Sequence, residues 1–133
     1  MNLTTKTSLL VARNVVNHFE MLLDSTPMKY RDIDTSGVTL MVGSFQNGRE
    51  QGLSISAFGV KLANGKYGST TYYISEDRSS DSIVVYVGEW VNNSGDSGWA
   101  EVRSYFNYGK YAEAAEYIQS DIFEKLQAQS EPA

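Results

Sequence analysis

Hydrophobic residues recur at helical spacing near both ends of the chain. Between residues 5 and 24 they return every three or four positions, which predicts an amphipathic helix. A similar stripe predicts a C-terminal helix over 110–128, either continuous or kinked into two near Asp121, because Asp121 and Glu124 resemble a capping pair. The apolar positions are Leu9, Ala12, Val15, Val16, Phe19, Leu22 and Leu23 in the first stripe, and Tyr111, Ala114, Ala115, Ile118 and Ile122 in the second.

Between these helices, apolar and polar residues alternate in short runs, as is typical of β-strands. Asn64-Gly65 predicts a hairpin turn, and a shift in the apolar phase predicts a bulge near Gly59. We therefore expect an α+β fold in a single domain, residues 1–133, with an antiparallel meander of about five strands over 38–107 and both helices on one face. The expected strands are 38–45, 53–62, 68–75, 82–90 and 99–108, with a weak edge strand at 28–34.

If both helices cover one face of the sheet, its other face is open. In the strand 82–90, Ile83, Val85 and Val87 alternate with a more mixed set, so one side is plainly apolar. Leu10 and Met21 lie on the far side of the first helix, where a monomer would normally present polar groups, and this indicates a partner chain. By the same alternation, the open face carries Thr71, Tyr73, Ser75, Tyr86, Arg103 and Trp99.

The composition excludes several classes of function. The chain has no cysteine and one histidine, so we expect neither a metal site nor a disulfide, and no cofactor. A net charge of −5 argues against a generic basic nucleic-acid binder. No segment is apolar enough to span a membrane and no leader is evident, so we expect a soluble protein of cytosolic origin.

Candidate catalytic groups are sparse. His18 lies on the polar side of the first helix, and the carboxylates of Glu76, Asp77 and Asp81 occupy a serine-rich turn where solvated acids are common. The glycine-containing loops lack the spacing of phosphate-binding motifs. We therefore expect no enzymatic activity. Nine tyrosines and two tryptophans could stack unpaired bases, although strand propensity alone also explains aromatic residues in a sheet.

Residues 68–126 resemble the coat proteins of single-stranded RNA bacteriophages. The order is TTYYIS, a polar turn, IVVYV, a glycine-containing loop, and then AEVRSYFNYGKYAEAAEYIQSDIFEKL. In that family a strand of the form A-acid-V-x-x-x-F runs directly into two helices that end in a leucine-rich segment. The matching residues here are Ala100, Glu101, Val102, Phe106 and Leu126.

The resemblance implies a homodimer whose two sheets join edge to edge, with the helices of each subunit crossing over the other. It further implies an icosahedral shell, assembled in the cytoplasm of the host bacterium, whose sheets face genomic RNA. The alternative is a small non-viral homodimeric module that binds a peptide or small ligand on the open face, and an enzyme ranks third.

Three groups of candidate residues follow from this resemblance. The candidate RNA contacts are Thr71, Tyr73, Ser75, Arg78, Tyr86, Trp99 and Arg103. The loop expected to contact other dimers comprises Val91, Asn92, Asn93, Ser94, Gly95, Asp96, Ser97 and Gly98. The candidate dimer interface comprises Leu10, Met21, Ile122, Phe123 and Leu126.

Overall fold

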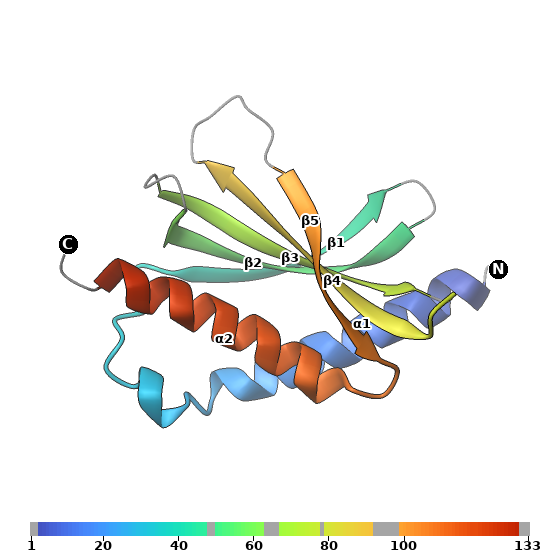
Figure 1. Ribbon diagram of the computed structural model, residues 1–133, viewed down its shortest axis with the longest axis horizontal. Coiled ribbons are helices and arrows are strands. Elements are labelled where there is room, and N and C mark those ends of the chain that lie inside the picture. Colours follow the sequence, from blue (N-terminus) through green and yellow to red (C-terminus); the bar gives the residue numbers. More distant parts are fainter. Residues whose placement is uncertain (1–2, 48–49, 63–66, 78, 92–98, 131–133) are drawn as a thin grey trace.

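Two long helices lie against one face of a strongly twisted antiparallel sheet (Figure 1). The structure is a computed structural model and describes residues 3–47, 50–62, 67–77, 79–91 and 99–130. The α+β fold expected from the sequence is confirmed. In chain order the elements are α1 (Leu3–Leu23), a 3₁₀ turn η1 (Met28–Tyr30), β1 (Thr39–Asn47), β2 (Glu50–Lys61), β3 (Tyr67–Asp77), β4 (Ser82–Val91), β5 (Trp99–Asn107) and α2 (Tyr111–Ser130).

The sheet is a five-stranded meander in the order β1-β2-β3-β4-β5. Its central register aligns Ile55 of β2 with Tyr72 of β3, and Tyr72 with Val87 of β4. Directly paired residues share a face, so these three side chains lie on the side that the helices cover. All three are buried. This agreement between alternation and burial fixes the register, because a slip by one residue would turn the apolar side chains outward.

The core forms where α1 and α2 meet the middle of the sheet. Val15 and Phe19 of α1 and Ile118 of α2 are almost fully buried, together with Ile74 and Val85 of the sheet. The spacing of the α1 residues reproduces the predicted stripe, and α1 ends near Pro27, which has no N–H to continue a helix. The predicted stripes are therefore the surfaces that bury the core.

The predicted bulge lies at Gly59, where the β2–β3 register shifts between Phe58 and Val60. Gly59 has φ +87°, and a Cβ atom there would collide with the carbonyl oxygen of Gly37. Only glycine fits this conformation and this close approach easily. The turn at Asn64-Gly65 lies outside the described residues.

One expectation about the elements is wrong, and one alternative left open by the sequence is decided. The segment 28–34 is not an edge strand, because residues Met28–Tyr30 form a 3₁₀ turn in which the Tyr30 N–H bonds to the Pro27 carbonyl at 2.9 Å. The C-terminal helix has no break at Asp121, since α2 runs unbroken from Tyr111 to Ser130. Asp121 uses its carboxylate on Tyr72 and Lys125 instead of capping a new helix.

Candidate functional site: the outer face of the sheet

The outer face is the side of the sheet that faces away from α1 and α2 (Figure 1). One row of paired residues crosses it from Gly43 of β1 through Ser54 and Tyr73 to Tyr86 of β4. Tyr73 and Tyr86 are direct cross-strand partners and both are half-buried. The sequence-based expectation that these two tyrosines share a face is therefore confirmed.

Phe45 of β1 adds a third aromatic ring beside Tyr73 and Tyr86. Its ring meets the Tyr73 ring edge-on, with centroids 5.2 Å apart and planes at 82°. Phe45 is paired with Gly52, and a Cβ atom on Gly52 would lie 2.8 Å from the Phe45 ring. The ring therefore lies over a glycine, an arrangement that protects backbone otherwise left bare. We call Phe45, Tyr73 and Tyr86 the aromatic row; the alternation pattern did not reveal the contribution of Phe45.

Two of the candidate RNA contacts are buried within the chain. Thr71 retains 7% and Ser75 1% of their accessible surface. The Thr71 hydroxyl is 2.9 Å from the Ser56 hydroxyl, so the two form a hydrogen bond between neighbouring strands. Tyr73 and Tyr86, which are half-buried, therefore remain the more accessible candidates among the described ones.

The other candidates are placed only in part. Trp99 is paired with Glu89. Arg103 has no direct partner on β4, because the register shifts there: the residues on either side of it, Val102 and Ser104, are paired with the consecutive residues Tyr86 and Val85. The single alternation expected along the whole of 99–108 is therefore wrong, because the register changes within the strand. The side chains of Trp99 and Arg103 lie outside the described residues, as do Arg78 and the loop residues 92–98. Val91 ends β4, opposite Gly68.

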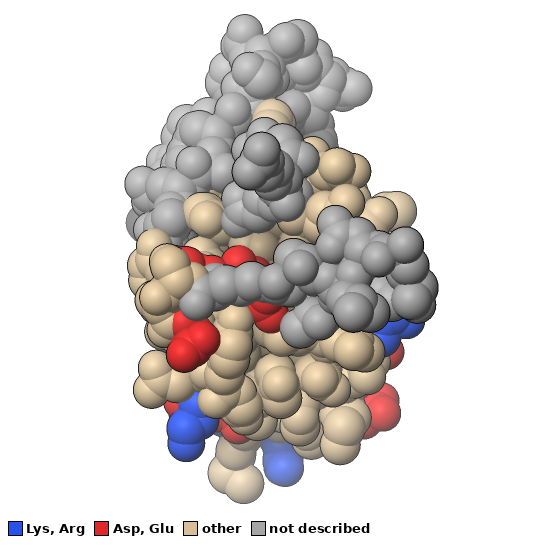
Figure 2. Space-filling view, turned by 90° about the vertical axis from the view of Figure 1, so that its right-hand side faces the viewer, with Lys and Arg blue, Asp and Glu red and all other residues tan. Residues whose placement is uncertain are grey.

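Charge on this face is low. In the row through Tyr73 and the next row, through Ser56 and Thr71, the described positions on β1 to β4 carry no lysine or arginine. In the end-on view of Figure 2, described acidic and basic residues are interspersed among uncharged surface without a continuous basic patch. Any ligand held by the aromatic row is therefore bound mainly by stacking and polar contacts.

The five candidate interface residues divide into two groups. Leu10 and Met21 are 59% and 68% exposed on α1. Ile122 and Leu126 are buried in the chain's own core, and Phe123 stacks on Tyr30 with ring centroids 5.0 Å apart and planes 9° from parallel. Phe123, which the sequence left without a partner, thus packs within its own chain, and the exposed candidates are Leu10 and Met21.

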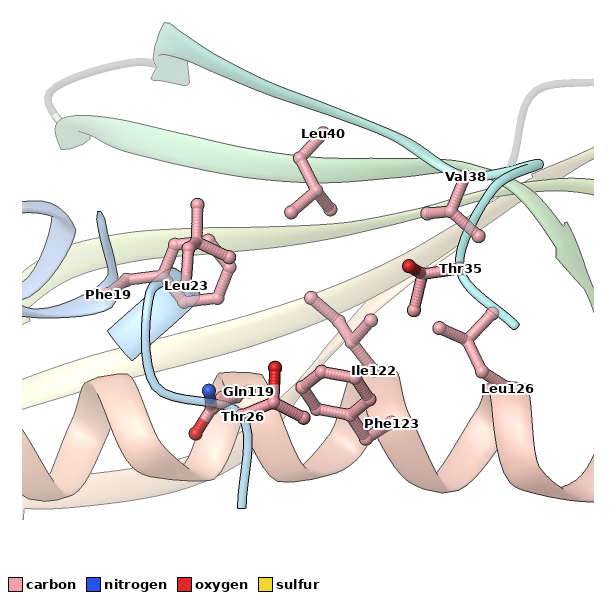
Figure 3. Close-up of a pocket in the computed structure, with 10 residues that line it drawn as sticks. All are labelled: Phe19, Leu23, Thr26, Thr35, Val38, Leu40, Gln119, Ile122, Phe123 and Leu126. Atoms are coloured by element: carbon pink, nitrogen blue, oxygen red, sulfur yellow. The ribbon is translucent and has the colours of Figure 1, made fainter. Parts of the chain in front are cut away.

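A pocket of about 200 Å³ opens between α1, α2 and β1, and no pattern in the sequence predicted it (Figure 3). The side chain of Gln119 forms part of its wall and donates a hydrogen bond to the Leu22 carbonyl at 2.9 Å. The segment between α1 and β1 contributes Thr26, Thr35 and Val38 to the lining. Its lining is Phe19, Leu23, Thr26, Thr35, Val38, Leu40, Gln119, Ile122, Phe123 and Leu126.

Among the acidic candidates of the serine-rich turn, Asp77 has a structural role. Asp77 accepts hydrogen bonds from the Ser79 hydroxyl at 2.6 Å and the Ser79 N–H at 3.0 Å. Hydrogen bonds from Ser79 and Ser80 hold the pKa of Asp77 below its ordinary value. Within the described ranges, no group of three or more His, Asp and Glu residues is arranged to bind a metal. Nor is any helix there long and apolar enough to cross a membrane.

Comparisons with protein-family models, with curated proteins and with solved structures found no match to this chain.

Proposed function

We propose that this chain is the coat protein of a single-stranded RNA phage, which forms homodimers and assembles into an icosahedral shell around RNA. The observation that carries the proposal is the order of elements around the sheet. A five-stranded antiparallel meander passes from β5, ending at Asn107, into α2, beginning at Tyr111, as the resemblance over 68–126 implies. Both helices lie on one face of the sheet (Figure 1). The strand register places the aromatic row on the other face.

The edges of the sheet support pairing between copies. β1 and β5 are the end strands, so each has one edge without a partner strand among the described residues. β1 carries no charged side chain from Thr39 to Asn47, and Met41 and Val42 are exposed. On β5, Tyr105 is 57% exposed. Exposed backbone edges favour strand addition, especially where no charged side chain opposes it, as on β1, and a second copy supplies a matching strand.

The aromatic row supports the RNA-binding part of the proposal. Tyr73, Tyr86 and Phe45 present ring surface on the face opposite the helices, and unpaired bases stack on such rings without sequence preference. Because the described part of the row lacks cations, each dimer binds RNA weakly, and many copies in a shell hold the genome together.

Electron microscopy of the purified full-length protein tests the proposal. A coat protein is expected to form uniform closed shells that contain nuclease-protected RNA. Dimers without shells would contradict the coat function and favour the non-viral binding module. Closed shells that contain no RNA would support shell assembly but contradict RNA binding by the outer face.

A further inference from the structure

The exposed side of α1 carries a regular stripe. Leu10, Asn14, Asn17 and Met21 are all exposed and follow one another at steps of four, three and four residues. This spacing keeps side chains in line along a helix and is the spacing of a two-helix seam. The buried residues Val11, Ala12, Val15, Val16 and Phe19 occupy the opposite side of the same helix. α1 therefore has a second surface that the described part of the chain leaves uncovered.

The stripe is complementary to itself when two copies run antiparallel. A two-fold axis midway between Asn14 and Asn17 places Leu10 of one chain against Met21 of the other, and Asn14 against Asn17. The apolar side chains then meet each other at both ends of the seam. The two amides meet in the middle, where each supplies a donor and an acceptor to the other.

The flanking charges favour the same direction. Arg13 and Glu20 are exposed, lie on one flank of the stripe, and are separated by two helical turns. In the antiparallel arrangement this flank of one chain faces the same flank of the other. Arg13 of each chain is then offset from Glu20 of its partner by two positions, about 3 Å along the axis, which is within reach of these long side chains and gives two pairs of opposite charge. In a parallel arrangement in register, the flanks that carry Arg13 and Glu20 lie on opposite sides of the seam, so these opposite charges do not meet. Charge complementarity thus selects an antiparallel second copy as the occupant.

We propose that α1 pairs antiparallel with α1 of a second copy through Leu10, Asn14, Asn17 and Met21. This contact is separate from the sheet edges and does not depend on the coat function. A seam of one helix per chain is smaller than a standard stable interface, so it associates weakly alone and strengthens when other contacts hold the copies together. A chain with two different self-contacts builds assemblies larger than a dimer.

Disulfide trapping tests both the contact and its direction, because the native chain has no cysteine. The variants are Leu10→Cys, Met21→Cys and the double variant Leu10→Cys/Met21→Cys. Along one helix, positions 10 and 21 are about 16 Å apart, too far for a disulfide within a chain. The antiparallel seam brings position 10 of one copy against position 21 of the other, while the two copies of position 10 stay about 16 Å apart.

Under mild oxidation, the double variant is expected to form a covalent dimer on non-reducing gels, at least tenfold more than either single variant. Equal trapping in the single variants, or no trapping in the double variant, would overturn the proposal. Both positions are exposed, and circular dichroism checks that the helices remain. The outcome is independent of whether shells form, so it separates this contact from the coat function.

A charge exchange provides a second measurement on the cysteine-free chain. Arg13→Glu and Glu20→Arg each place like charges across the seam, and each is expected to weaken self-association measured by sedimentation. The double variant Arg13→Glu/Glu20→Arg restores opposite charges and is expected to restore association. Glu116→Arg, at an exposed position of α2, is the matched control. Failure of the double variant to recover would contradict the antiparallel pairing.

Discussion

The Tyr72 hydroxyl donates a 2.5 Å hydrogen bond to Oδ2 of Asp121, and this bond links the centre of the sheet to α2. The tyrosine ring is fully buried, while the same carboxylate oxygen lies 3.4 Å from the Lys125 ammonium near the surface. A residue that looks like a helix cap in the sequence thus connects the two layers. Lys125, which interrupts the apolar stripe of α2, lies one helical turn away and balances the charge of Asp121.

Tyr72→Phe tests this bond, because it keeps the ring and removes only the hydroxyl. We expect a loss of about 1.5–3 kcal/mol in the free energy of unfolding, since a hydrogen bond to a charged group contributes about that much. Urea denaturation measures the change. Tyr105→Phe, on an exposed ring, is the control and is expected to change stability by less than about 0.5 kcal/mol. Equal stability of the two variants would show that the bond contributes nothing.

Gly59→Ala tests the bulge. The substitution combines a positive φ with a collision against the Gly37 carbonyl, so we expect a loss of about 2–4 kcal/mol in the free energy of unfolding. Gly109→Ala isolates the backbone effect, because Gly109 has the same φ of +87° but no atom within 4 Å of the added Cβ. It is expected to cost about 1 kcal/mol. Thermal unfolding of both variants measures the two losses of stability. If they are similar, the close approach of Gly59 to Gly37 contributes nothing beyond the positive φ.

Phe123→Ala tests whether Phe123 serves its own chain. Its ring stacks on the buried Tyr30, so we expect a loss of about 1–3 kcal/mol in stability, independent of protein concentration. Met21→Ala, at an exposed position, should leave the stability of the single chain within about 0.5 kcal/mol. Denaturation at several protein concentrations separates the two roles. A loss for Phe123→Ala that disappears on dilution would place Phe123 in an interface instead.

Lysine substitutions at the two end strands test edge-to-edge pairing. Val42→Lys on β1 and Tyr105→Lys on β5 change exposed positions and place a charge where a second sheet would add its strand. We expect one of them to abolish sheet-mediated dimers and the other to leave them intact. Light scattering coupled to size-exclusion chromatography gives the mass. Each lysine variant is also made in a Leu10→Asp background, in which the proposed α1 contact is disrupted. If both variants still form dimers in that background, pairing through these edges is excluded.

Tyr86→Ala tests RNA binding by the aromatic row. Loss of a stacking ring costs about 1–3 kcal/mol per base, so we expect particles that retain less RNA than the wild type. Because described cations are absent from the row, the affinity of dimers for RNA should fall only shallowly as salt is raised. The RNA content of purified particles and binding across a salt series provide the measurements. Tyr108→Ala, in the turn before α2, is the control, and equal RNA content in both variants would exclude stacking on Tyr86.

The sequence alone determined the type of each long element and which face of its regular parts is buried. Between residues 5 and 24, apolar residues recur at helical spacing, and in β4 they alternate strictly at Ile83, Val85 and Val87. Each pattern indicates which side chains are buried on folding, and these side chains define the inner face of their element. The bulge near Gly59 could also be predicted from the sequence, because a bulge moves every later side chain of the strand to the other face and so shifts the apolar pattern. These are local properties of the chain.

Only the tertiary structure decided which side chains meet across long separations in the chain. Tyr72 and Asp121 are 49 residues apart, and no periodicity links a buried hydroxyl to a carboxylate on another layer. The same holds for the stacking of Phe123 on Tyr30, and for Phe45, which reaches Tyr73 across the intervening strand β2. Burial of Thr71 and Ser75 on a face that the alternation leaves open was equally hidden, since it depends on the size of the neighbouring side chains and on the twist of the sheet. Periodicity fixes the direction in which a side chain points, and packing fixes what it meets there.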